Sequence, residues 1–104
     1  MTNKKIVIII VVVIAIVIIV MIQQHELYVK NRGKMFNLSR AKVEDSLLNV
    51  RPERVTKYGV EIYGQEYPVL QILAAATGTP KIEWSTVNTY RILQKLGFEI
   101  RIHE

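Results

Sequence analysis

The longest apolar stretch of the chain lies close to its first residue, at Ile6–Ile22. It comprises seventeen residues without a charge, a polar side chain, a glycine or a proline. As an α-helix it would rise about 1.5 Å per residue and reach roughly 25 Å, close to the ~30 Å hydrocarbon core of a bilayer. The pattern predicts a single transmembrane helix at residues 6–22, after a short basic N-terminus at residues 1–5.

Two other interpretations of this stretch compete with an uncleaved anchor: a cleaved signal peptide and a buried strand. Lys4 and Lys5 would suit the basic start of a cleaved signal peptide. Against that, the stretch exceeds the usual ~7–15 apolar residues of a signal, and bulky polar residues, not a small-residue cleavage site, follow it. Its β-branched composition would suit a buried strand, but seventeen residues are too many for one. We therefore expect an uncleaved anchor.

After the apolar stretch the pattern becomes mixed and predicts a linker followed by a helix. Residues 23–35 are expected to continue the membrane helix briefly and to break at Asn31–Gly33, forming a juxtamembrane linker. Apolar residues then recur at helical spacing over Phe36–Val50, with Asn37 or Ser39 able to cap the start. Pro52 is expected to end this helix.

The rest of the chain predicts a hairpin, two helices and a closing strand. Residues 55–63 alternate like a strand, a turn follows at Gly64-Gln65, and residues 66–67 return. Helices are expected at Val69–Thr77 and Thr86–Leu96, the second capped by Ser85, and a strand at Phe98–Ile102. The prediction is therefore an α+β domain at residues 36–104, in which about three helices pack on a three-stranded sheet.

Basic residues gather in the first part of this domain. Residues 30–57 hold eight basic and three acidic residues, whereas residues 58–104 hold four and five. We expect Lys30, Arg32 and Lys34 to contact anionic lipid headgroups; a nucleic-acid surface is the alternative. The excess of basic residues after the apolar stretch favours a cytoplasmic location for the C-terminal domain. With no cysteine, disulfides give no evidence on the compartment.

Few residues suggest catalysis. The two histidines, His25 and His103, lie at opposite ends of the domain sequence, and both are expected at the surface. Glu44 and Asp45 are adjacent on a predicted helix, so their side chains would point in different directions. The glycines form no phosphate-binding loop. We therefore expect a protein that is not an enzyme and that holds no cofactor or metal.

One group of residues suggests binding. Aromatic residues gather in the predicted hairpin and in the loop before the last helix, with basic residues nearby in the sequence: Tyr58, Tyr63, Tyr67 and Trp84, with Arg51, Arg54, Lys57 and Lys81. Aromatic rings can stack on bases while cations pair with phosphates. The alternative is that the rings cover a small core and that the cations are solvated.

A longer set of residues supports a family resemblance over residues 51–102. They are Pro52-Glu53-Arg54-Val55, Tyr58, Val60, Ile62, Gly64, Tyr67-Pro68-Val69, Gln71, Ala76-Thr77-Gly78, Trp84-Ser85-Thr86, Arg91-Ile92-Leu93 and Leu96-Gly97-Phe98-Glu99-Ile100. This pattern resembles the DNA sulfur-binding-type domains of McrA-like type IV restriction endonucleases and their small stand-alone relatives. The sequence departs from that family in having no nuclease part and in carrying Ile82-Glu83-Trp84-Ser85 where a glycine-rich loop is common.

The resemblance implies a groove that contacts a DNA backbone, with Tyr67 and Pro68 at an apolar pocket. Charge and proximity, not the family, suggest Arg51, Arg54 and Lys57 for phosphate contacts. The leading hypothesis is a non-enzymatic, membrane-anchored binding module of bacterial or phage origin that contacts DNA through a basic, aromatic-containing face. The alternative is a small single-pass envelope or phage-encoded protein whose domain binds a protein partner while its basic segment docks on lipid.

Overall fold

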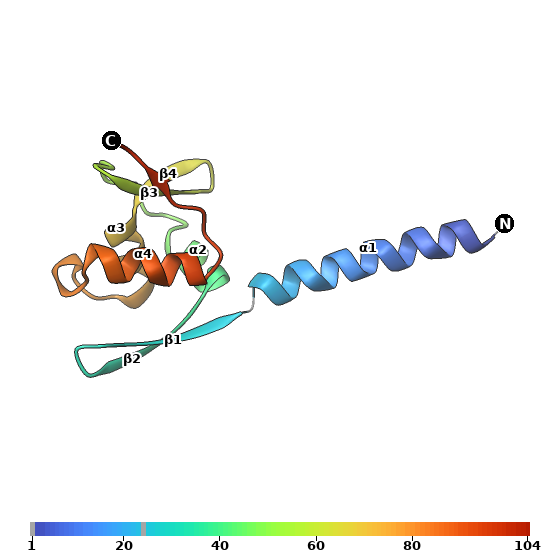
Figure 1. Cartoon of the computed structure of the whole chain (residues 1–104), viewed down its shortest axis with the longest axis horizontal. Coiled ribbons are helices and arrows are strands. Elements are labelled where there is room, and N and C mark those ends of the chain that lie inside the picture. Colours follow the sequence, from blue (N-terminus) through green and yellow to red (C-terminus); the bar gives the residue numbers. More distant parts are fainter. Residues whose placement is uncertain (1, 24) are drawn as a thin grey trace.

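The computed structural model describes residues 2–23 and 25–104. A long helix, α1 (Thr2–Gln23), projects from a small domain that contains all the remaining elements (Figure 1). Between Ile6 and Met21 the large apolar side chains of α1 are 42–66% exposed. The segment Asn3–Met21 is long and apolar enough to cross a membrane, although a signal sequence would have the same properties.

The domain begins with a β-hairpin that the sequence pattern did not reveal. Strand β1 (Glu26–Asn31) pairs antiparallel with β2 (Lys34–Ser39). The predicted linker at residues 23–35 and the predicted start of a helix at Phe36 are therefore wrong. Leu27, Val29 and Phe36 alternate onto one face of the hairpin and pack against the core. Arg32 and Gly33 form its turn, with φ angles of 51° and 78°.

The predicted long helix over residues 36–50 is reduced to the short helix α2 (Arg40–Ser46). Ser39, one of the two expected capping residues, accepts a hydrogen bond from the backbone N–H of Lys42 at 3.1 Å. Residues 36–39 instead continue β2, because pairing with β1 provides hydrogen-bond partners for their backbone.

The predicted three-stranded sheet is confirmed, with strand order β4-β3-β5. Its strands are β3 (Tyr58–Ile62), β4 (Gln65–Pro68) and β5 (Arg101–Ile102). Strands β3 and β5 are shorter than the predicted ranges 55–63 and 98–102, whereas β4 extends one residue beyond the predicted 66–67 at each end. The tight turn falls at Tyr63-Gly64, one residue before the predicted position, with φ angles of 53° and 76°. All neighbouring strands in this sheet are antiparallel.

The two predicted C-terminal helices are also present. Helix α3 spans Val69–Thr77 and ends at Gly78, whose φ of 70° is the left-handed conformation expected of a terminating glycine. A short 3-10 turn, η1 (Lys81–Glu83), occupies the expected loop. Helix α4 spans Thr86–Lys95, and Ser85 caps it by accepting a hydrogen bond from the backbone N–H of Asn88 at 3.2 Å.

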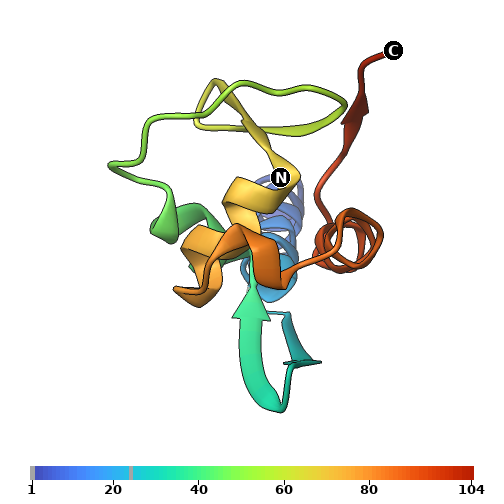
Figure 2. The ribbon, with the colours of Figure 1, turned by 90° about the vertical axis from the view of Figure 1, so that its left-hand side faces the viewer.

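Helices α2, α3 and α4 lie between the two sheets (Figures 1 and 2). The β1–β2 hairpin covers one side of the helical layer and the three-stranded sheet covers the other. Side chains from both sheets and from α2, α3 and α4 share one core, whose buried apolar members are Leu38, Val43, Leu47, Val60, Ile62, Tyr67, Val69, Ile72, Leu73, Trp84, Ile92, Leu93, Leu96 and Phe98. The hairpin is thus an integral layer of the domain.

Candidate binding surface

Two of the aromatic residues expected to stack on bases belong to the core. Tyr67 is 2% exposed, and its hydroxyl donates a hydrogen bond to the carbonyl of Val50 at 2.7 Å. Trp84 is 6% exposed, and its indole N–H donates to Thr79 Oγ1 at 2.7 Å. Their rings are covered on both sides, so neither can serve as a stacking platform, and the expectation that they contact nucleic acid is corrected.

The other expected aromatic and proline positions are only partly accessible. Tyr58, at the start of β3, packs edge-on against Tyr90 of α4 with ring centroids 5.4 Å apart. The ammonium group of Lys57 lies 5.3 Å from the centroid of the same ring. Pro68 is the residue that precedes α3 and is half-buried. Of the four predicted aromatic residues, Tyr58 is therefore partly accessible, and Tyr63, at the turn between β3 and β4, is 54% exposed.

The basic loop before β3 is held in place by one glutamine. Gln71 of α3 donates from Nε2 to the carbonyl of Arg51 at 2.9 Å and accepts from the N–H of Glu53 at 2.8 Å. Lys81 of η1 forms an ion pair with Glu53 at 2.7 Å. Both of those side chains are half-exposed, so the pair contributes little to stability, but it connects η1 with the loop.

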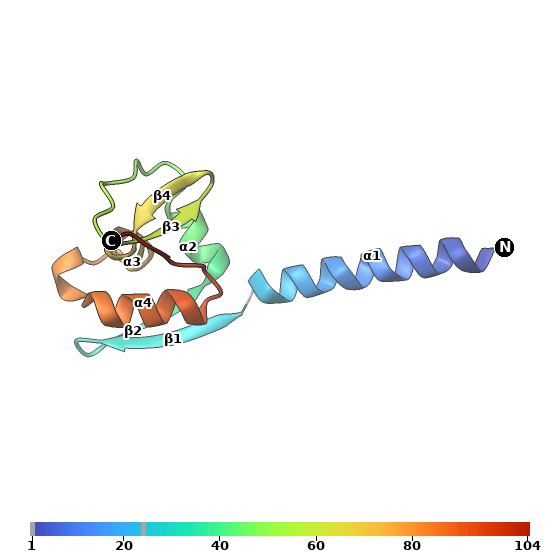
Figure 3. The same cartoon turned by 45° about the horizontal axis from the view of Figure 1, so that its top comes forward.

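The turn of the first hairpin lies beside the same 3-10 turn. Asn31 donates from Nδ2 to the carbonyl of Glu83 at 2.9 Å. The β1–β2 hairpin extends away from α1, so its turn lies at the end of the domain opposite α1 (Figures 1 and 3). The residues expected to contact lipid, Lys30, Arg32 and Lys34, are placed at this distal end and not beside α1.

Three segments therefore meet through η1, and we call them the distal basic surface: residues 30–34, 51–57 and 81–83. Together they contain seven basic and two acidic residues. The basic side chains are all exposed: Lys30, Arg32, Lys34, Arg51, Arg54, Lys57 and Lys81. Of these seven, only Lys81 takes part in an ion pair within residues 2–23 and 25–104. Sequence reasoning assigned the seven to two separate surfaces.

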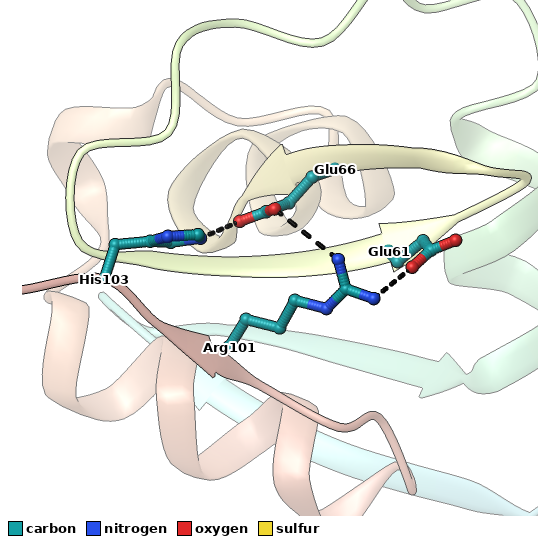
Figure 4. A network of polar contacts seen from close by, with 4 residues as sticks. All are labelled: Glu61, Glu66, Arg101 and His103. Carbon is teal, nitrogen blue, oxygen red and sulfur yellow. Dashed lines mark hydrogen bonds and ion pairs between the residues drawn. The ribbon is translucent and has the colours of Figure 1, made fainter.

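A second polar cluster fixes the C-terminal strand on β3 (Figure 4). Arg101 of β5 forms ion pairs with Glu61 and, at 3.8 Å, with Glu66. His103 contacts the Glu66 carboxylate as well, and its backbone N–H donates to the carbonyl of Lys57 at 2.7 Å. Gly59 leaves the space that the Glu66 side chain occupies, because a Cβ atom there would overlap it. These contacts attach β5 to its neighbours in the sheet, which gives the polar residues around His103 a structural role.

The pKa of Tyr63 is shifted by its surroundings. Partial desolvation, together with the nearby carboxylates of Glu44 and Asp45, raises the pKa of Tyr63 above its ordinary value. Tyr63 lies at the turn between β3 and β4 and is half-exposed. Within the part of the chain that the structure describes, no three His, Asp or Glu side chains are grouped so that they could hold a metal ion.

Comparison with known proteins identifies the family. The profile of the SCO5918-like family matches residues 19–104, which include the last part of α1 and the whole domain. The chain belongs to the SCO5918-like family. This match overturns the resemblance to DNA sulfur-binding domains of McrA-like restriction enzymes, whose shared residues include turn glycines, helix caps and core positions of this fold. No curated protein and no solved structure matches this SCO5918-like chain.

Proposed function

We propose that this SCO5918-like protein is a membrane-anchored, non-enzymatic binding module whose distal basic surface contacts nucleic acid. The observation that carries the proposal is the meeting of three basic segments at η1, made by the contacts Asn31–Glu83 and Glu53–Lys81. Six exposed cations there, without carboxylate partners in the described residues, are available to phosphates. Phosphate contacts supply most of the affinity in binding that does not depend on sequence.

The placement of the aromatic residues sets the expected mode of binding. With Tyr67 and Trp84 in the core, Tyr58 is half-buried against Tyr90, and the exposed Tyr63 lies beside the carboxylates of Glu44 and Asp45, which would repel phosphates. Binding is therefore expected to depend on the phosphate backbone and to discriminate little between base sequences. Duplex and single-stranded ligands should both bind, and affinity should fall steeply with salt concentration.

The proposal requires the domain to face the cytoplasm. Helix α1 would serve as a single-pass anchor, and the basic residues that follow it favour retention of the domain on the cytoplasmic side. The hairpin turn, at the end opposite α1, would then reach away from the bilayer and toward a soluble ligand (Figure 3). A topology reporter fused after Glu104 tests this requirement, and a readout outside the cytoplasm would contradict nucleic-acid binding.

The binding experiment uses the full chain in nanodiscs of zwitterionic lipid. A labelled DNA duplex and its single strand are titrated at about 50 and 200 mM salt, where a protein with several phosphate contacts loses orders of magnitude in affinity. We expect the double variant Arg54→Gln/Lys57→Gln to weaken binding and to reduce the logarithmic salt slope by up to about 2.

The matched control removes two exposed basic residues that lie outside the distal basic surface. The double variant Lys42→Gln/Lys95→Gln has the same formal change in charge. It is expected to leave the salt slope nearly unchanged. Equal losses in the two double variants would show that net charge, not the distal surface, attracts the ligand, and no binding at the lower salt concentration would end the proposal.

A further inference from the structure

A small cleft opens between Tyr58, at the start of β3, and helix α4. It has a volume of about 290 Å³, and its lining comes from Tyr58 of β3 and from one face of α4: Thr86, Val87, Tyr90, Arg91 and Gln94. Its walls are mainly apolar, and Val87 at the rim is 60% exposed. Pockets for small ligands usually measure about 300–1,000 Å³, so this cleft suits one or two apolar side chains better than a whole cofactor.

The sheet edge next to the cleft is open. Strand β5 is the outermost strand on this side, and Ile102 lies directly opposite Tyr58, which lines the cleft. His103 donates its backbone N–H to Lys57, so the alternation of antiparallel pairing turns the backbone N–H and C=O of Ile102 outward. An outward-facing edge of this kind is the element to which an extended peptide adds by β-augmentation.

Charge indicates the chemistry of the peptide. Arg91 lies on the cleft wall and Lys57 lies over the Tyr58 ring, and both side chains are exposed. Neither forms an ion pair with a carboxylate in residues 2–23 or 25–104. The cleft itself has no acidic residue in its lining. In an extended peptide, an acidic side chain two positions from an apolar one lies on the same face and would complement these cations and the apolar wall.

We propose that the cleft between Tyr58 of β3 and α4, together with the open edge of β5, binds an extended acidic peptide segment of a partner protein. The peptide adds to the outer edge of β5 at Ile102. Two of its side chains, two positions apart and therefore on one face of the strand, enter the cleft, an apolar one toward Val87 and an acidic one toward Arg91. This site is separate from the distal basic surface except for Lys57, and it does not depend on the nucleic-acid proposal.

The test uses the full chain in zwitterionic nanodiscs and a labelled heptapeptide whose acidic and apolar residues share one face of a strand, Thr-Glu-Thr-Val-Thr-Asp-Thr. Three probes are compared: this peptide, its lysine counterpart, and a version N-methylated at alternate amides so that it cannot pair along a strand. We expect only the unmethylated acidic peptide to bind and to shift the NMR signals of the Ile102 amide and the Val87 methyl groups.

Two charge-reversal variants on α4 distinguish binding at the cleft from non-specific electrostatic attraction of the acidic peptide. Arg91→Glu should weaken the acidic peptide at least tenfold, whereas Lys95→Glu, one turn further along α4 and outside the cleft, should change its affinity less than threefold. Trp84 fluorescence checks that both variants are folded, since Trp84 is the single tryptophan and is buried. The proposal is overturned by equal effects of the two variants, by equal binding of the N-methylated peptide, or by absence of binding.

Discussion

The two hairpins of the domain have the same kind of turn, but the sequence predicts one of them much more clearly than the other. Each turn has two central residues, a larger one followed by glycine: Arg32-Gly33 in β1–β2 and Tyr63-Gly64 in β3–β4. The φ angles are 51° and 78° in the first and 53° and 76° in the second. Positive φ at both positions is typical of the type I′ turn, whose twist matches that of paired strands.

The difference lies in what flanks the turns. Pro52 precedes the β3–β4 hairpin and Pro68 ends it, and each proline disfavours a helical conformation in the residue before it. The β1–β2 hairpin directly follows a long helix, and its apolar residue Phe36 also fits a helical spacing with Val43 and Leu47. A turn motif therefore predicts a hairpin clearly only when the flanking residues exclude a helical periodicity.

The largest expected effect tests whether both hairpins are equally integral to the fold. Leu38 of β2 and Ile62 of β3 are 2% and 3% exposed. Replacing either with alanine removes buried apolar volume and should lower the free energy of unfolding by about 2–5 kcal/mol. Denaturant titration followed by Trp84 fluorescence measures this.

The control for this pair is Met35→Ala, because Met35 lies on β2 but its side chain is exposed. It should change the free energy of unfolding by no more than about 0.5 kcal/mol. If Leu38→Ala lowers the free energy of unfolding as little as Met35→Ala does, while Ile62→Ala gives the full expected loss, the first hairpin is peripheral to the fold. The two hairpins would then not be equally integral.

The second prediction concerns the two turn glycines. A Cβ atom at Gly33 or at Gly64 would meet no heavy atom within 4 Å, so alanine at either position introduces backbone strain without a clash. Left-handed φ angles cost a residue with a Cβ roughly 1–2 kcal/mol, and we expect Gly33→Ala and Gly64→Ala to lose similar amounts of stability in that range. The same fluorescence titration applies, and a loss at only one glycine would show that the two turns are not equivalent.

The sequence predicts those parts of the fold that depend on neighbouring residues. The bounds of α3, the capping of α4 by Ser85 and the β3–β4 hairpin follow from prolines, glycines and a serine at the ends of apolar periods. The site was harder to predict because burial is a tertiary property. Tyr67 and Trp84 look like surface aromatics beside cations until the carbonyl of Val50 and the hydroxyl of Thr79 satisfy their polar atoms in the core.

The distal basic surface illustrates the same limit. Asn31 and Glu83 are 52 positions apart, and Glu53 and Lys81 are 28 apart. No local pattern links these segments, so their cations were divided between lipid and nucleic acid. A sequence signal for the hairpin was present, since Leu27, Val29, Phe36 and Leu38 alternate about Arg32-Gly33. Recognising it would have placed Lys30 and Lys34 on paired strands.

A third, smaller effect concerns Gly59 of β3, which leaves room for the Glu66 side chain. Gly59→Ala would place a Cβ atom where the Glu66 side chain lies, so Glu66 must rotate away from Arg101 and His103. Exposed ion pairs contribute up to about 1 kcal/mol each, and the loss of global stability should be of that order. Hydrogen exchange at the Arg101 and His103 amides should accelerate. Glu66→Gln is the matched change that weakens the ion pairs and keeps Gly59; unchanged exchange in both variants would contradict this role of Glu66.

The smallest expected effect is a gain, and it applies to both turns. Arg32 and Tyr63 adopt positive φ, which asparagine tolerates better than other residues with a Cβ atom. Arg32→Asn should raise the free energy of unfolding by a few tenths of a kcal/mol up to about 1 kcal/mol. Tyr63→Asn should gain less, because the half-exposed Tyr63 ring also covers part of a polar pocket beside Arg40 and Phe98. Lys34→Asn, in a strand position, controls for asparagine itself and should give no gain.

The Arg32→Asn variant also separates folding from binding. It removes one cation of the distal basic surface while relieving strain at the turn, so stability and nucleic-acid affinity should move in opposite directions. The expected change in binding is a fall in the salt slope of about 1 or less, the share of a single phosphate contact. If affinity instead rises together with stability, the hairpin turn acts by ordering the surface and Arg32 makes no contact of its own. That result would restrict the proposed nucleic-acid contacts to the loop at residues 51–57 and to Lys81.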